Sequence, residues 1–162
     1  MLEETMILQM PPSLKMTEEQ FFEFCQINGD LRIETNKVGE LLIMSPVGSE
    51  TGNREFNLCV QLGLWSEQDG TGLAFSSSAG FTLSTGAKKS PDASWIKLER
   101  WMSLSQEEKE KFAPICPDFV VELMSPSDSL KTLQEKMEEY MAEPGVKSVS
   151  YTHLTLPTTS RV

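Results

Sequence analysis

A single carboxylate interrupts the most apolar stretch of the sequence. Glu122 stands inside Phe119–Met124, a β-rich run with no other charge. An ionised carboxylate is costly to bury without a partner, so the run predicts a cation, a lysine or an exit to water beside Glu122. An edge strand with Glu122 facing water is the simpler alternative. Apolar residues on both faces favour a central strand instead, and the helix expected next puts the strand's C-terminal end where α/β proteins gather ligands.

A second acidic residue, Asp92, begins another predicted strand directly after Pro91. Pro-Asp is also a common turn dipeptide, so this position indicates little by itself. Asp118 shares a strand face with Glu122, but the two are ~13 Å apart, which is too far for one metal ion. If the strands of Asp92 and Glu122 are neighbours, these two carboxylates can share an ion.

A lysine on the last predicted helix, 129–142, could complete such a site. At 100° per residue, Lys131 falls opposite the apolar stripe of this helix, in solvent, whereas Lys136 falls beside the stripe and can reach over the sheet. Alternatively, Lys136 lies along the helix edge and pairs with Glu139. As a surface lysine, it is expected to change stability by no more than about 0.5 kcal/mol when lost.

The elements that must position these residues follow from capping boxes, turn residues and hydrophobic periodicity. Thr17 with Gln20, and Ser105 with Glu108, each predict the start of a helix. The helix that begins near 49 or 51 carries apolar stripes on two sides, which predicts burial between layers. Together the elements predict an α/β fold with a mixed sheet and helices on both faces. In chain order they are helix 17–28, strands 31–35 and 40–44, the helix from 49 or 51, strands 73–77 and 81–83, loop 84–90, strand 92–96, the helix from 105, strand 119–124 and helix 129–142.

Composition limits the chemistry. The 162 residues, 39% apolar and 23% charged, fit one globular domain. A net charge of −10 argues against clamping nucleic acid by bulk electrostatics, although a local basic site remains possible. No apolar run or signal-like N-terminus indicates a membrane or secretion, so a cytoplasmic location is expected. Three widely spaced cysteines and one histidine predict neither a disulfide framework, a zinc site nor a catalytic triad.

The last fifteen residues differ in character from the rest. Ser148–Val162 holds four threonines and no acidic residue. It resembles the read-through tail of a truncated sequence, so we predict a domain over residues 1–147 and a non-native tail over 148–162. The tail replaces the strand expected after Gly145-Val146, which predicts a C-terminally truncated domain. We expect it to pack poorly and to add little to the core.

Ordered blocks over roughly residues 10–147 resemble the Uma2 family of putative restriction endonucleases, within the PD-(D/E)XK superfamily. The resemblance implies a restriction-endonuclease-like mixed central sheet flanked by helices. Asp92 matches the motif aspartate, and Glu122 matches the acidic residue of the following strand. Met124 stands where the motif lysine is expected, and Lys136 matches the position that takes this role in relatives. Glu50 is a weak candidate to complete the metal site. The blocks are 31–34, 39–46, 90–95, 117–128, helix 133–140 and 145–146.

The resemblance also implies an activity and partners. It predicts an endonuclease that hydrolyses phosphodiester bonds of DNA with Mg²⁺, or with Mn²⁺, and that can form a homodimer. Asp92, Glu122 and Lys136 would be its catalytic residues. A catalytically inactive nuclease-fold module with a binding or regulatory role is the alternative, because the chain is acidic and Met124 replaces the motif lysine.

Overall fold

A four-stranded sheet forms the centre of the domain in the computed structural model, which describes residues 5–125 and 128–153. Its strands lie in the order β4 (Gly72–Ser76), β7 (Ala93–Lys97), β8 (Phe119–Met124) and β9 (Ser148–His153). The first three pair antiparallel, and β9 runs parallel to β8. The sheet is therefore mixed, as predicted, and the strand that carries Glu122 is internal.

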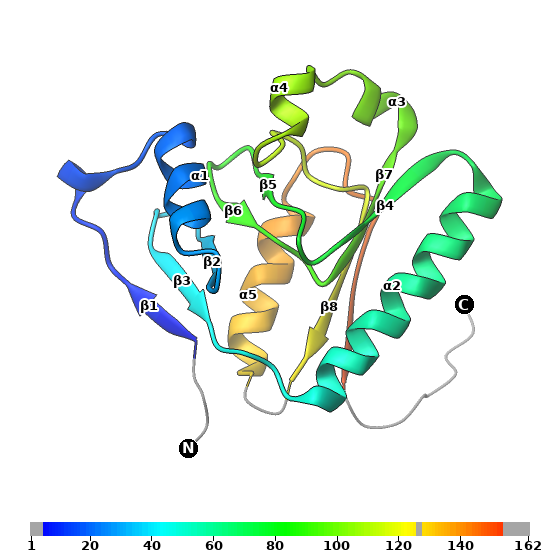
Figure 1. Cartoon of the computed structure of the whole chain (residues 1–162), viewed down its shortest axis with the longest axis horizontal. Coiled ribbons are helices and arrows are strands. Elements are labelled where there is room, and N and C mark those ends of the chain that lie inside the picture. Colours follow the sequence, from blue (N-terminus) through cyan, green and yellow to red (C-terminus); the bar gives the residue numbers. More distant parts are fainter. Residues whose placement is uncertain (1–4, 126–127, 154–162) are drawn as a thin grey trace.

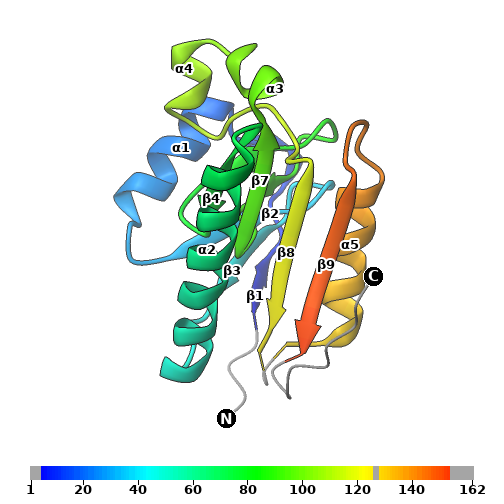
Figure 2. The same cartoon turned by 90° about the vertical axis from the view of Figure 1, so that its right-hand side faces the viewer.

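Helices cover both faces of this sheet. The long helix α2 (Ser49–Asp69) packs on β4 and β7, and α5 (Leu130–Met141) packs on β8 and β9. Figures 1 and 2 show the two helices on opposite sides of the sheet. This arrangement confirms the predicted α/β class. Where the chain is described, no helix combines the length and apolarity needed to cross a membrane.

A smaller N-terminal lobe packs beside the α5 face. Its sheet has the order β1 (Met6–Leu8), β3 (Leu41–Met44), β2 (Arg32–Thr35), all antiparallel. The short 3-10 helix η1 (Pro12–Leu14) and helix α1 (Glu18–Ile27) complete it, and α1 begins at the predicted capping box. Phe21, Ile33 and Leu41 form the lobe's buried core, so Ile33 faces α1 and its neighbours along β2 face the other way.

Short elements connect the lobe to the main sheet. The two-stranded ribbon of β5 (Phe81–Thr82) and β6 (Lys88–Lys89) brings β6 against β2. Helices α3 (Leu98–Met102) and α4 (Gln106–Lys109) lie at one end of the domain, and α4 begins at the predicted capping box. The sequence patterns did not predict β1, β6 or α3. Each has five residues or fewer, too short to show a periodicity.

Two expectations are wrong. Helix α2 is not buried between layers, because it packs on the sheet through one side and leaves Phe56, Leu64 and Trp65 exposed. Residues 148–153 do not pack poorly, because they form β9, which pairs with β8 along all six residues. Backbone pairing does not depend on acidic or apolar composition, and Val149 also packs against the core. Residues 154–162 lie outside the described part of the chain, and a non-native origin of 148–162 stays a prediction.

Candidate active site

The register of two neighbouring strands brings Asp92 beside Glu122. Ala93 pairs with Val121 across β7 and β8, and Asp92 immediately precedes β7. Its Oδ2 accepts a hydrogen bond of 2.6 Å from the backbone N–H of Leu123. Glu122 is 4% exposed, so the alternative of an edge strand with this residue facing water is wrong.

Helix α5 places Lys136, and not Lys131, against Glu122. The Lys136 Nζ lies 2.8 Å from Glu122 Oε1, and the side chain is 14% exposed. The Lys131 side chain is 84% exposed and pairs with Glu135 at 3.8 Å. Helical phase predicted this difference correctly. It did not predict the degree of burial: Lys136 is no surface lysine, so the premise behind the expected small stability effect is wrong, and the effect itself is untested.

Strand β2 supplies two further charged residues. Both Nη atoms of Arg32 donate to Asp92 Oδ1 at 3.1 Å, and Nη2 also donates to the Ser90 carbonyl. Glu34 is fully buried, and its Oε1 accepts hydrogen bonds of 2.9 Å from Lys136 Nζ and from the Ser90 N–H. We call Arg32, Glu34, Asp92, Glu122 and Lys136 the buried charge cluster.

Sequence reasoning assigned no role to Arg32 or Glu34, although both stand in the hairpin that carries the family resemblance. The available signal was their spacing. Residues two apart on a strand point to the same face, so Arg32 and Glu34 were a charge pair on the face opposite Ile33. Tyr140 on α5 is fully buried and adds a polar contact: its hydroxyl donates to Glu122 Oε1 at 3.1 Å.

Burial and mutual charge shift the acid–base behaviour of the cluster. Burial raises the pKa of Glu122 to about 7, since the opposing effect of Lys136 is smaller and both Asp92 and Glu34 add to the rise. Burial acts the same way on Glu34, but Lys136, Lys89 and Arg32 outweigh it and the Glu34 pKa is lowered. For Lys136, burial alone would lower the pKa, yet Glu122 and Glu34 raise it above the ordinary value. At neutral pH the Lys136 ammonium is therefore charged, and Glu122, with its pKa raised to about 7, lies close to its titration point.

The carboxylate oxygens of Asp92 and Glu122 are suitable ligands for a magnesium ion. Mg²⁺ usually takes one or two carboxylates and keeps several waters, and Asp92 and Glu122 supply two. Within residues 5–125 and 128–153, no group of three or more His, Cys, Asp or Glu side chains is arranged to hold an ion. Because Arg32 occupies Asp92 Oδ1, coordination by that oxygen requires the guanidinium to move.

Glu50 differs from the buried charge cluster in its exposure and in its ion-pair partner. It sits in the first turn of α2 with its side chain 80% exposed, and its carboxylate pairs with Arg54 at 2.6 Å. The proposed part of Glu50 in a metal site therefore stays a prediction.

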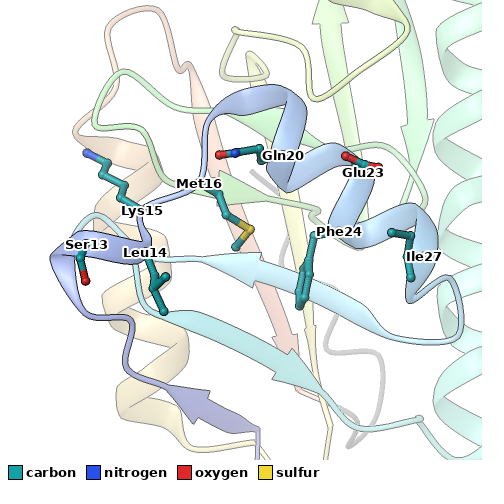
Figure 3. A pocket seen from close by; sticks show the side chains of 8 residues that line it. All are labelled: Ser13, Leu14, Lys15, Met16, Gln20, Glu23, Phe24 and Ile27. Atoms are coloured by element: carbon teal, nitrogen blue, oxygen red, sulfur yellow. The ribbon is translucent and has the colours of Figure 1, made fainter.

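A separate surface hollow lies on the N-terminal lobe between η1 and α1 (Figure 3). Its volume is about 510 Å³, and none of its lining residues belongs to the buried charge cluster. The hollow is lined by Ser13, Leu14, Lys15, Met16, Gln20, Glu23, Phe24 and Ile27.

A mixed sheet between helices, with acidic residues from two adjacent strands and a lysine against one of them, defines a nuclease-like domain. The chain belongs to the Uma2 family of putative restriction endonucleases, which matches residues 18–151. This match extends four residues past the boundary predicted at 147.

A solved structure supports the fold. A putative nuclease belonging to DUF820 from Anabaena variabilis ATCC 29413 matches with a TM-score of 0.65 and 15% identity. The alignment covers 85% of this chain and 74% of that one. At this identity the likeness establishes the architecture and not the activity. No protein with a curated description matches the chain.

Proposed function

We propose that this chain is a Mg²⁺-dependent endonuclease that hydrolyses phosphodiester bonds of DNA through Asp92, Glu122 and Lys136. The observation that carries the proposal is the convergence of these three side chains, from the residue before β7, from β8 and from α5, within a family of putative restriction endonucleases. Mn²⁺ could replace Mg²⁺, because it also accepts carboxylate oxygens.

Each residue has a distinct task in this proposal. Asp92 and Glu122 would hold the ion, and this requires Glu122 to be ionised. When bound, the ion would supply Lewis-acid chemistry, which favours developing charge on a phosphate and a lower pKa of bound water. Lys136 stays protonated, so its ammonium can donate hydrogen bonds to a phosphate oxygen as negative charge builds up on it.

Access to the site involves Arg32. Its side chain is 30% exposed, against 14% or less for the other members of the buried charge cluster. Arg32 therefore lies between solvent and Asp92. Movement of Arg32 would free an oxygen of Asp92 and turn a guanidinium toward an incoming phosphate, which suits an acidic chain that has no bulk attraction to DNA.

A specific observation favours the alternative of an inactive binding or regulatory module. Each carboxylate of the cluster already has a cation beside it, since Arg32 meets Asp92 while Lys136 meets Glu34 and Glu122. Such a cluster can be stable without any metal ion. The two proposals differ in whether the chain cleaves DNA.

Plasmid cleavage tests the proposed function. Supercoiled plasmid incubated with the chain and Mg²⁺ or Mn²⁺ should become nicked or linear, and EDTA should stop the reaction. Asp92→Asn should abolish cleavage, whereas Asp30→Asn, at an exposed turn before β2, should cleave like the parent. An inactive parent that still binds the metal would support the inactive module. Homodimer formation and a cytoplasmic location stay predictions, and sedimentation of the purified chain tests the first.

A further inference from the structure

The most buried carboxylate of the domain makes an incomplete set of contacts. Glu34 is 0% exposed. Its Oε1 accepts two hydrogen bonds, but its Oε2 is buried with no hydrogen-bond partner among the described residues. Buried polar atoms are nearly always paired, and an unpaired one calls for an explanation.

The contacts of Glu34 all lead to the candidate active site. Lys136 Nζ lies between Glu34 Oε1 at 2.9 Å and Glu122 Oε1 at 2.8 Å, so one ammonium joins β2 to β8. The Ser90 N–H, which also donates to Glu34, belongs to the segment that leads into Asp92. Two residues earlier on β2, Arg32 holds Asp92 itself. The N-terminal lobe thus contacts Asp92 directly through Arg32 and reaches Glu122 through the shared ammonium of Lys136.

We propose that Glu34 is a positioning residue for Lys136: its carboxylate anchors the same lysine ammonium that Glu122 contacts. The lysine stem crosses from α5, where several rotamers would carry Nζ away from the sheet. Two carboxylates on two different strands restrict Nζ to the space between them. This inference rests on the proposed function for its catalytic consequence, but the anchoring itself does not depend on activity.

Replacing Glu34 by a neutral residue of the same size separates the effect of its charge on Lys136 from its contribution to packing. Glu34→Gln keeps the size of the side chain and can still accept the Ser90 hydrogen bond, but it removes the charge that faces Lys136. Glu40→Gln is the matched control, because Glu40 lies at the turn end of the same hairpin and bonds to Asn36. If Glu34→Gln does not fold, Glu34→Asp provides the same test, since it keeps the charge but shortens the reach by one methylene.

Chemical labelling of lysines measures how firmly Lys136 is held, and it does not require the protein to cleave DNA. An amine-acetylating reagent followed by mass spectrometry should modify Lys131 quickly and Lys136 slowly in the parent, since their exposures differ sixfold, 84% against 14%. In Glu34→Gln, labelling of Lys136 should accelerate about tenfold, while Lys131 serves as the internal reference. Equal Lys136 labelling in parent, Glu34→Gln and Glu40→Gln would overturn the proposal.

Kinetics test the catalytic consequence in a parent that cleaves DNA. Glu34→Gln should lower kcat at least tenfold with little change in KM, because substrate still binds while the lysine is misplaced. An unchanged kcat would overturn the positioning role. If the parent does not cleave DNA, the proposed function fails, and faster Lys136 labelling in Glu34→Gln still supports the anchoring.

Discussion

Replacing Lys136 by methionine removes the cation that two buried carboxylates share. Its Nζ lies within 2.9 Å of both Glu34 and Glu122, and the side chain is only 14% exposed. Loss of one partner from a buried ion pair costs about 3–5 kcal/mol, because the remaining charge stays in the interior. In a domain of this size, each kcal/mol lowers Tm by about 2–4 °C. We therefore expect Lys136→Met to melt roughly 6–20 °C below the parent near pH 8.

The loss should shrink at lower pH. Burial has raised the pKa of Glu122 to about 7 from an ordinary value of 4.5, so the folded state binds this proton more tightly than the unfolded state. A raised pKa of this kind contributes stability at low pH, and that contribution is lost as pH rises through the folded value. Without Lys136 the Glu122 pKa rises further. Protonation then relieves the unpaired charge at a lower free-energy cost near pH 5.5 than near pH 8.

Thermal unfolding followed by circular dichroism at both pH values measures this effect. Lys131→Met is the matched control on the same helix, and its exposed side chain should change stability by no more than about 0.5 kcal/mol. Equal melting temperatures for the two variants near pH 8 would refute the reasoning. A Lys136→Met variant that loses more stability near pH 5.5 than near pH 8 would refute the assigned role of Glu122.

Other predictions concern the ion and the backbone. Arg32→Gln should tighten Mg²⁺ binding in calorimetry, because it removes a competing cation from Asp92; weaker binding would contradict this. Mg²⁺ binding to the parent should strengthen from about pH 6 to about pH 8 as Glu122, with its pKa about 7, loses the proton that blocks coordination; a flat profile would exclude it as a ligand. Gly72→Ala should destabilise the fold in urea unfolding, since its Cβ would lie 2.4 Å from a backbone oxygen of β7. Gly63→Ala, whose Cβ meets nothing within 4 Å in α2, should instead add about 1 kcal/mol.

Local chemistry made much of the fold predictable. Thr17 and Ser105 cap α1 and α4 where the four-residue patterns predicted, because a capping box is satisfied by atoms within one turn. Helical phase likewise separated Lys136 from Lys131, since both positions follow from one rotation per residue. The apolar strand around Glu122 predicted its own burial.

The remaining features depended on contacts between segments far apart in the chain. Arg32 and Glu34 alternate with Ile33 on a short strand, and this pattern is also typical of a solvent-facing strand surface. Burial of Glu34 arises only because Ser90 and Lys136, 56 and 102 residues away, cover that face. The outer side of α2 shows the converse, since its apolar residues predicted a covering layer that the described chain does not supply.

The balance of positive and negative side chains in the buried charge cluster explains why a proton and a metal ion would compete for Glu122. Three carboxylates face two cations, because Lys89, which also acts on Glu34, is paired with Glu139 at 3.3 Å. One negative charge is therefore in excess, and Glu122, whose pKa is raised to about 7, can take up a proton near neutral pH. If Arg32 moves away, the excess becomes two negative charges, which one divalent cation would balance. The cluster is thus stable when protonated and most receptive to a metal ion once Glu122 is ionised.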